Sequence, residues 1–496
     1  MESARPIIKI FDSVKPARAI YGSLRTSDLT KLLRVSRTFF RLVAPVVWGT
    51  IPIEKIANLI PGVEKADSES GIYENVLVIP KHPDMSRVYV YAPYIKRLNA
   101  TPQYRIKFGN MYEPSSAPGL LPNLAHISLA SLPNYDSGDF GGIWDPIDVD
   151  WLAYFACPSL LSFEMYGFDA GRDDYADPLS GLPWIEQSEA LKLFDWISGR
   201  CPHIEKLRIF PYESPTVGPI NMSLGYMQLA TLVYLRSFTY AGLEVDQELM
   251  DALSLLPRLE SLQFISNMPE TPNYHSGCDE YYKPGTWPEY DFPDPIVLPK
   301  DAFPALRSLE LLKLGPKVIA RICRLKPLFR NLTRFKVTYE DYSSPYWKGR
   351  DWRNEVLASL GNLSSCLTDL EIDNVLALDM TVEKLAQMPL QRLGLRGIGV
   401  RGLDHAGWKK FVDAIPNLEI LNIRFGPTYE CLNVLAQGIP SLRVLSQAAL
   451  YFTEMKGLKE DADLKVKQRL PSQEITLQTT FRLRFPMERQ VDEVAR

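Results

Sequence analysis

Three glycines, Gly397, Gly399 and Gly402, have the G-x-G-x-x-G spacing of a dinucleotide-binding turn. They follow an apolar stretch that predicts a strand and precede one that predicts a helix, the context in which such glycines let the backbone approach a pyrophosphate. Glycines also serve any tight turn from a strand to a helix. We interpret them as turn residues, because a repeat array lacks the reversal in strand order at which a cofactor crevice forms.

No other spacing in the sequence points to catalysis. It contains no phosphate-binding G-x-x-x-x-G-K-[ST], no zinc-binding H-E-x-x-H and no nucleophile-bearing G-x-S-x-G. The histidines and cysteines are dispersed, without a C-x-x-C pair or a partnering His spacing. We therefore expect a protein that is not an enzyme and has no catalytic residue, metal site or cofactor.

The charge balance gives no chain-wide attraction to phosphate or anionic lipid. There are 55 Lys and Arg against 59 Asp and Glu, a net charge of -4, so neither nucleic acid nor a membrane is an expected partner. The N-terminus lacks the apolar run of a signal peptide, and the longest uncharged runs are interrupted by Pro, Gly and amide residues. Without a disulfide pattern, these features predict a cytoplasmic or nuclear protein.

A repeat organises most of the chain. The pattern L-x-x-L-x-L, usually preceded by Pro or Asn, recurs at spacings of 23 to 47 residues. Its last two apolar positions are two residues apart, as in a strand with one buried face, and its first position predicts a turn packed beneath that strand. The twelve first positions are Ile95, Leu124, Leu160, Ile204, Leu235, Leu259, Leu306, Leu332, Leu367, Leu390, Leu418 and Leu442.

Helices are predicted between several of these strands. Residues 184–197, 246–256 and 404–415 carry apolar residues three or four apart, and two of these segments begin at an Asp suited to an N-cap. A strand and a helix each leave one apolar face that only neighbouring units can cover. The expected fold is therefore an α/β solenoid, a curved parallel sheet with helices on its convex side. Over residues 72–451 the pattern resembles the leucine-rich repeat family.

Charged and aromatic side chains on this scaffold are candidates for binding a protein. Residues that alternate with the buried strand positions face the concave side, where charges of both signs, Lys206 and Arg208 among them, could recognise a partner or could simply be solvated. An insert at 266–300, rich in proline, acids and aromatics, is expected to lie ordered over the rim, with shorter inserts at 134–150, 167–183 and 339–352 along the same rim. The candidate partner-binding residues are Arg334, Lys336, Asp369, Glu371, Asp373, Arg392, Arg396, Arg424, Tyr281, Tyr282 and Trp287.

An amphipathic helix is predicted before the repeats. Between residues 26 and 44 the apolar residues form a wide stripe, and Pro45 is expected to end the helix. The short N-terminus offers little to cover so large an apolar face. We expect another chain or the first repeats to cover it.

The same segment resembles the F-box of fungal proteins, the three-helix module that docks a substrate receptor onto the adaptor of an SCF-type, cullin-based ubiquitin ligase. The resemblance lies in DL at 28–29, VSRTFF at 35–40 and PVVW at 45–48, while the opening of the module is shortened to residues 6–11. It implies a protein that binds the SCF adaptor, and through it a cullin, and holds a protein substrate on its repeats. The implied adaptor-binding residues are Leu29, Leu32, Leu33, Val35 and Phe40.

Two other interpretations remain open. The N-terminal helices could serve only as the cap that a solenoid needs on its first apolar face, which leaves a protein-binding scaffold with no ligase link. The protein could also be a hydrolase or a GTPase regulator built on the repeats, but no sequence motif supports this interpretation. The expected organisation is an F-box-like module at 1–50, a linker and first irregular repeat at 51–94, the solenoid at 95–455, and a C-terminal cap or tail at 456–496 that includes an alternating, strand-like stretch at 474–485.

Overall fold

The computed structural model of the chain divides into two compact units, Met1–Leu306 and Arg307–Arg496. We describe each unit by itself. The described residues are 23–66, 75–80, 82–100, 104–108, 119–130, 149–166, 185–212, 221–241, 245–265, 295–312, 314, 316–338, 366–373, 382–396, 405–423, 434–435, 437–447 and 476–479.

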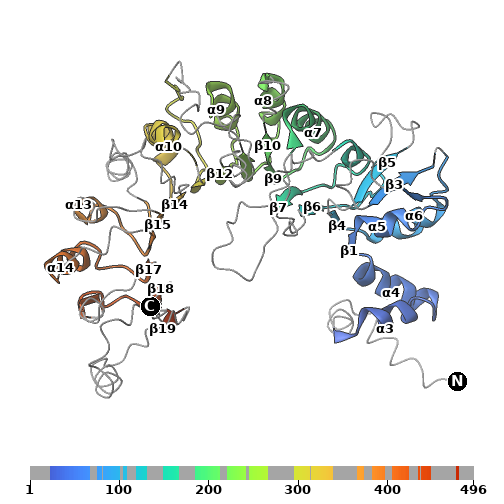
Figure 1. Cartoon of the computed structure of the whole chain (residues 1–496), viewed down its shortest axis with the longest axis horizontal. Coiled ribbons are helices and arrows are strands. Elements are labelled where there is room, and N and C mark those ends of the chain that lie inside the picture. The colour runs from blue at the N-terminus through green and yellow to red at the C-terminus, as the bar shows by residue number, and fades with distance from the viewer. Residues whose placement is uncertain are drawn as a thin grey trace, which may run out of the picture. The chain divides into compact units, whose positions relative to one another are not determined.

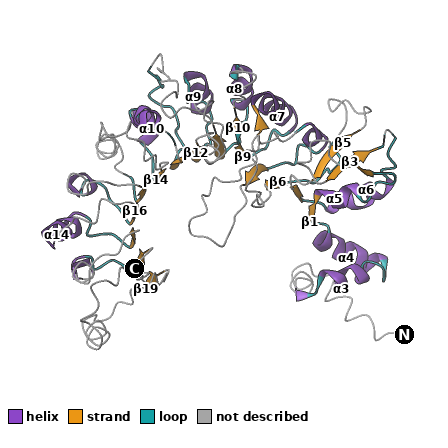
Figure 2. Ribbon diagram, in the orientation of Figure 1, coloured by secondary structure: helices purple, strands orange, loops and turns teal. Residues whose placement is uncertain are grey.

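The first unit is built on parallel strands paired in the order β1-β4-β6-β7-β9-β11-β12 (Figure 1). Helices α7 (Gln187–Arg200), α8 (Ser223–Leu229) and α9 (Gln247–Ser254) lie side by side along one face of these strands (Figure 2). The strands are β1 (Thr50–Pro52), β4 (Arg97–Ala100), β6 (His126–Ala130), β7 (Ser162–Tyr166), β9 (Lys206–Ile209), β11 (Ser237–Ala241) and β12 (Ser261–Ile265).

Shorter elements complete the first unit. Two small sheets accompany the main one: β2 (Glu64–Ala66), β3 (Asn75–Ile79) and β5 (Tyr104–Phe108) form the first, and β8 (Ile185–Glu186) and β10 (Pro211–Tyr212) form the second. The remaining helical elements are α3 (Thr26–Leu32), α4 (Arg37–Val47), α5 (Ile53–Ala57), α6 (Ser86–Tyr91), and the 3-10 turns η1 (Ala92–Tyr94) and η2 (Asp150–Tyr154).

The second unit repeats the same plan. Its strands pair in parallel in the order of the chain, and its helices α10 (Pro316–Cys323), α11 (Lys326–Phe329), α13 (Val382–Leu385) and α14 (His405–Ala414) come between them. The strands are β13 (Ser308–Leu312), β14 (Arg334–Thr338), β15 (Asp369–Asp373), β16 (Arg392–Arg396), β17 (Ile420–Ile423), β18 (Val444–Gln447) and β19 (Thr476–Thr479).

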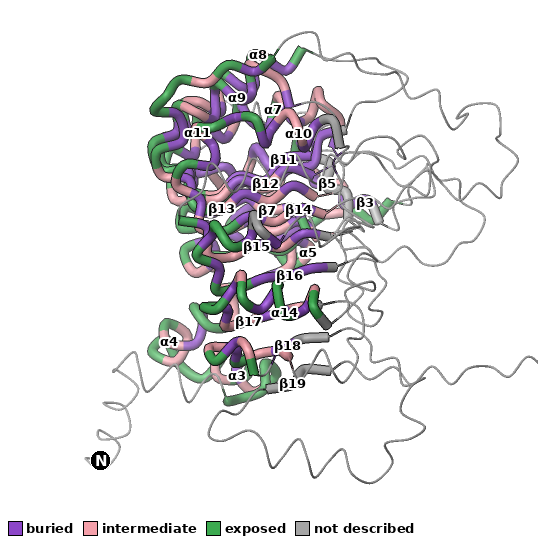
Figure 3. The backbone as a smooth tube through the Cα atoms, turned by 90° about the vertical axis from the view of Figure 1, so that its left-hand side faces the viewer, coloured by how far each residue is buried: buried purple, intermediate pink, exposed green. Residues whose placement is uncertain are grey.

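The repeat prediction is confirmed at every copy. Each of the twelve predicted strands begins two residues after its first position, from Ile95 before β4 to Leu442 before β18. All twelve first positions are at most 2% exposed, and buried residues alternate with less buried ones along the strands (Figure 3). The chain thus has the α/β leucine-rich-repeat solenoid fold. The strand-like stretch near the C-terminus is also a strand, β19, parallel to β18.

A turn explains why Pro so often precedes each repeat. The N–H of the first position donates to the carbonyl three residues earlier, as in Leu160 to Cys157, Ile204 to Cys201 and Leu418 to Ile415. In these turns Pro158, Pro202 and Pro416 occupy the second position, where the fixed φ of proline is already correct and no N–H is required.

Within each unit, a shared carbonyl fixes the register of a strand on the preceding one. The N–H groups of Lys96 and Arg97 both donate to the Gly49 carbonyl, at 3.0 and 2.9 Å, and those of Ala125 and His126 both donate to the Lys96 carbonyl. The same paired donation recurs in both units, as far as Arg443 and Val444 on the Glu419 carbonyl. A one-residue slip would turn every buried leucine to the opposite face, and this contact prevents it.

The predicted helices form where expected. Residues 187–200, 247–254 and 405–414 are helical, within or overlapping the predicted segments. The Asp246 side chain caps α9 by accepting the Leu249 N–H at 2.7 Å.

The N-terminal segment differs from the single helix predicted. It forms two helices, α3 and α4, because Ser36 accepts the Phe39 N–H at 3.2 Å and starts a second helix there. The prediction that Pro45 ends the helix is wrong, since α4 includes Pro45 and the Trp48 N–H again donates to the Ala44 carbonyl. A proline removes only one donor from the ladder, so the helix continues for a further half turn.

Strand β1 was not predicted, because its three residues are too short to show a period. It nevertheless forms the first strand of the unit, paired with β4 and with Ile51 fully buried. Gly49 makes the tight passage from α4 to β1 possible, since a Cβ there would lie 2.4 Å from the Pro45 carbonyl oxygen.

We predict that Gly49→Ala destabilises the protein by about 1–3 kcal/mol, because backbone, which cannot move aside as a side chain can, crowds the added methyl group. Gly199→Ala in α7 is the matched control, since nothing lies within 4 Å of a Cβ there. This control should be neutral or stabilising by up to about 1 kcal/mol. Urea denaturation of both variants measures the difference, and equal midpoints would contradict the close contact at Gly49.

Candidate protein-binding surface

The side chains that alternate with the buried strand positions form what we call the open face of each sheet, opposite the helices. In parallel strands held in register, equivalent positions lie beside one another at about 4.8 Å per strand. Residues far apart in sequence therefore become neighbours in rows across the open face.

The open face of the first unit carries a row of four polar residues, Arg97, His126, Ser162 and Lys206, on strands β4, β6, β7 and β9. The His126 Nδ1 lies 2.9 Å from the hydroxyl of Ser162, which is buried. Arg97 and Lys206 are exposed at the two ends of the row. Burial, followed by the cationic charges of Arg97 and Lys206, lowers the pKa of His126, against the opposing effect of Glu164. At neutral pH the imidazole is therefore uncharged.

A second group lies one step further along the same strands. The Tyr166 hydroxyl donates to Glu164 at 2.6 Å, and burial together with this hydrogen bond raises the pKa of Tyr166 to about 12. The Arg208 guanidinium lies 5.4 Å from the centre of the Tyr166 ring and 5.3 Å from that of Phe210, within cation–π range of both. The aromatic rings thus hold the Arg208 side chain in a defined position.

The open face of the second unit carries a ladder of ion pairs between neighbouring strands. Arg334 pairs with Glu310 at 3.3 Å, Lys336 with Glu371 at 3.4 Å, and Arg392 with Asp369 at 3.7 Å. Burial raises the pKa of Asp369 despite the opposing charges of Arg334 and Arg392.

Five of the predicted partner-binding residues thus come together in this ladder, paired with one another and with Glu310. Strands β15 and β16 also place the backbones of Asp373 and Arg396 opposite each other. The remaining predicted residues, Arg424, Tyr281, Tyr282 and Trp287, lie outside the described residues, as do Gly397, Gly399 and Gly402.

Sequence reasoning missed Arg97, His126 and Tyr166 as members of one surface. The signal was available, because Arg97, His126, Ser162 and Lys206 all stand at the third position of L-x-x-L-x-L. Aligning the repeats with one another would have placed them in one row. The contact of Arg208 with Tyr166 has no such signal, since it depends on side-chain conformation.

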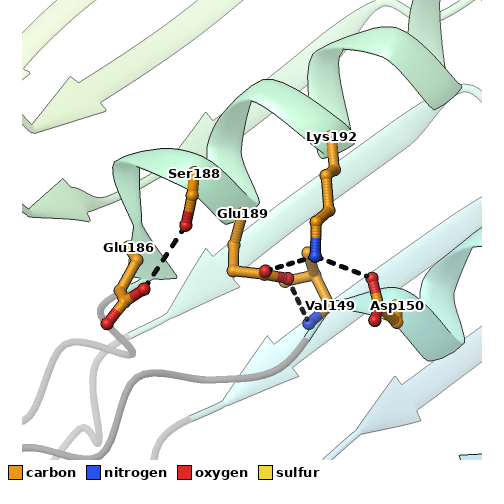
Figure 4. Close-up of polar contacts among 6 residues, drawn as sticks. All are labelled: Val149, Asp150, Glu186, Ser188, Glu189 and Lys192. Carbon is orange, nitrogen blue, oxygen red and sulfur yellow. Dashed lines mark hydrogen bonds and ion pairs between the residues drawn. The ribbon is translucent and has the colours of Figure 1, made fainter. Parts of the chain in front are cut away.

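The return points of two predicted inserts lie against each other on the helix side of the first unit (Figure 4). Glu189 of α7 accepts the Val149 N–H at 3.4 Å, and Lys192 contacts both Glu189 at 2.6 Å and Asp150 at 3.2 Å. The neighbouring Ser188 donates to Glu186 at 3.3 Å. These contacts hold the start of η2 against α7.

The five predicted adaptor-binding residues have different environments in the helical hairpin of α3 and α4. Leu29 is buried against Val43, and Leu32 and Leu33 pack partly buried around this pair. Phe40 contacts the rings of Tyr91 and Tyr94 at 6.0 Å, beside Trp48, which stacks on Tyr91 at 4.1 Å. Val35 is 63% exposed, and Leu24, just before α3, and Val46 in α4 are exposed as well.

The described cysteines Cys201 and Cys323 are buried, and one of the described histidines packs against an aromatic ring. Burial raises the pKa of Cys201 to about 12 and also raises that of Cys323, so neither thiol is ionised at neutral pH. His203 packs edge-on against Tyr234. Within the described ranges, no three His, Cys, Asp or Glu side chains are placed to share a metal ion. In those same ranges no helix has the length and apolar character needed to span a bilayer.

Comparisons with known proteins bear on the fold alone. No protein-family model matches the sequence, and no curated protein matches it. Among solved structures, the chain is similar to the leucine-rich repeat-containing protein LegL7 from Legionella pneumophila, with 13% identity and a TM-score of 0.32 over 53% of this chain and 82% of that one. It is also similar to a TLR13–ssRNA13 complex, with 11% identity and a TM-score of 0.27, over 77% of this chain and 57% of that chain's length.

A double-mutant cycle should show that the ladder stabilises the second unit. The side chains of Lys336 and Glu371 are only 23% and 19% exposed, so we expect a coupling energy near the upper end of the range of about 0.2–1 kcal/mol for surface pairs. The control pair, Asp28 and Lys31, has side chains 47% and 81% exposed and should couple by less. Alanine substitutions and urea midpoints give both values. A larger coupling for the control pair would count against the ladder.

The His126 pKa should respond to the ends of its row. We expect a pKa below 6.5, and we expect Arg97→Gln to raise it, because removal of a nearby cation favours the imidazolium ion. Lys206→Gln should raise it by a smaller amount, as Lys206 is the weaker of the two influences. NMR titration of the His126 ring protons, assigned with His126→Asn, measures these shifts. A pKa that does not change in Arg97→Gln would exclude the coupling.

Proposed function

We propose that this chain is a non-enzymatic receptor that binds a protein on the open faces of its repeats. The observation that carries the proposal is the register of the strands, which brings charged and aromatic side chains from separate repeats into continuous rows. Surfaces of this kind, rigid in backbone and varied in side chains, suit the recognition of a protein partner. The fold alone does not name the partner.

We further propose that the N-terminal hairpin connects this receptor to the adaptor of an SCF-type ubiquitin ligase. The match to the F-box at residues 28–48 supports this role. The exposure of Val35, Leu24 and Val46 also supports it, because three apolar side chains on one small hairpin would gain from burial by another chain. In such a complex the chain would contribute proximity, holding the lysines of its partner near the ubiquitin-loaded enzyme.

A second candidate is a scaffold without a ligase link, in which the hairpin only caps the solenoid. The packing of Phe40 and Trp48 against Tyr91 and Tyr94 favours it, since these contacts cover apolar surface at the first repeat. The two roles are compatible in one hairpin, because the capping residues and Val35 are different side chains.

Point substitutions test the ligase link better than deletion of the hairpin, because deletion would also remove the ring contacts of Tyr91 and Tyr94. We expect the full chain to retain the purified SCF adaptor in a pull-down, and Val35→Asp to reduce the retained amount at least tenfold, because a carboxylate cannot be buried there without a partner. Val90→Asp, at a valine that is 51% exposed on α6, is the matched control and should bind normally.

Two results would decide against the ligase link. Failure of the unsubstituted chain to retain the adaptor would leave the scaffold as the better description. Equal retention by Val35→Asp and Val90→Asp would show that the adaptor does not bind through the exposed apolar side of the hairpin.

A further inference from the structure

Among the described residues, the cations of the two open faces differ in whether a carboxylate lies within ion-pair distance. In the second unit the three cations Arg334, Lys336 and Arg392 each have a carboxylate within 4 Å. A partner binding there would first have to separate or desolvate these pairs, which offsets much of what its own charges would contribute.

The first unit is different. Among the residues that the structure describes, no carboxylate lies within ion-pair distance of Arg97 or Lys206, and both side chains are exposed. Glu164, the acidic residue in the next row, accepts a hydrogen bond from the Tyr166 hydroxyl and acts on His126 as a negative charge. The face formed by β4, β6, β7 and β9 therefore has cations available at both ends and a neutral hydrogen-bonding pair, His126 and Ser162, between them.

The electrostatic state of His126 gives independent support for this description. Arg97 and Lys206 both lower its pKa, against the opposing effect of Glu164, so both cations act on the middle of the row. Because the imidazole is neutral, the row has two positive charges, those of Arg97 and Lys206, rather than three.

We propose that this face binds an acidic, extended segment of a protein partner, with one carboxylate on Arg97 and another on Lys206. The proposal rests on the protein-binding function proposed above and names the chemistry of the partner. The backbones of Arg97 and Lys206 are three strand spacings apart, roughly 14 Å. An extended segment rises about 3.3 Å per residue, so the two acidic residues of the partner stand about four positions apart.

A nucleic acid fits this face less well. Its affinity comes from many phosphate contacts along a track, whereas the neighbouring strands β11 and β12 continue the rows with Ser237, Thr239, Ser261 and Gln263. Thr239 donates to Gln263 at 3.2 Å, so these rows remain polar and neutral. Charge complementarity is thus confined to a short length of chain, which suits a peptide segment.

The test is selection from a phage-displayed library of random twelve-residue peptides on the immobilised full chain, followed by fluorescence anisotropy with the enriched peptide. We expect enriched peptides to carry two acidic residues about four positions apart. Their affinity should fall at least tenfold in the double variant Arg97→Glu/Lys206→Glu. It should remain unchanged in Lys409→Glu, an exposed lysine on α14 that serves as the control for a charge reversal.

Several results would overturn the proposal: no enrichment, enrichment of peptides without acidic residues, or equal binding by the double variant. Tighter binding of a twelve-nucleotide oligouridylate, lost in the same double variant, would also overturn it in favour of a nucleic-acid site. If Arg97→Glu/Lys206→Glu fails to fold by circular dichroism, Arg97→Gln/Lys206→Gln replaces it, with the same tenfold criterion. Adaptor pull-down with the double variant separates the proposals, because retained adaptor with no peptide binding would leave the ligase link intact.

Discussion

The structure depends on one recurring hydrogen-bond arrangement, in which two successive N–H groups at the start of a strand donate to a single carbonyl of the preceding repeat. The residue before each donor pair is the first leucine or isoleucine of the repeat, at most 2% exposed in all twelve copies. The hydrogen bonds fix the register between neighbouring strands, and the buried apolar side chain anchors the start of each strand in the core. Together these contacts position each repeat on its neighbour within a unit.

Because of this arrangement, the position of a residue within its repeat determines where its side chain lies on the open face. With the register fixed, the third positions of the repeats within a unit fall in one row and the fifth positions in the next, whatever the length of the inserts between repeats. Arg97, His126, Ser162 and Lys206 are neighbours for this reason alone, although more than one hundred residues separate the first from the last. Variation in these rows changes the binding surface without disturbing the leucines beneath it.

Most of the fold could be predicted because burial on one side of a strand leaves a period-two pattern in the sequence. The twelve strands, the C-terminal strand β19 and the Asp246 cap were all evident from spacing. Strand β1 was not evident, since three residues are too few to show a period. The break between α3 and α4 was not evident either, because the apolar stripe continues through it and does not show that Ser36 caps a second helix. Ion pairing was also not evident from the sequence: the charged residues that we predicted as a binding surface on β14 to β16 form ion pairs across neighbouring strands.

The hairpin has one side that packs against the rest of the chain and another side that is exposed. Phe40 and Trp48 contact the first repeat, while Val35 points elsewhere and is largely exposed. The separation matters for function, because a partner could bind the exposed side without uncovering the end of the sheet.

Amide hydrogen exchange of the full chain, resolved to short segments by mass spectrometry, tests the paired-donor arrangement most directly. Segments that contain the donor pairs, such as those around Arg97, His126 and Ser162, should all be strongly protected, and protection should recur at the spacing of the twelve repeats. Exchange at these positions as fast as in an unfolded peptide would contradict the register on which the fold, the rows of the open face and the proposed partner site all rest.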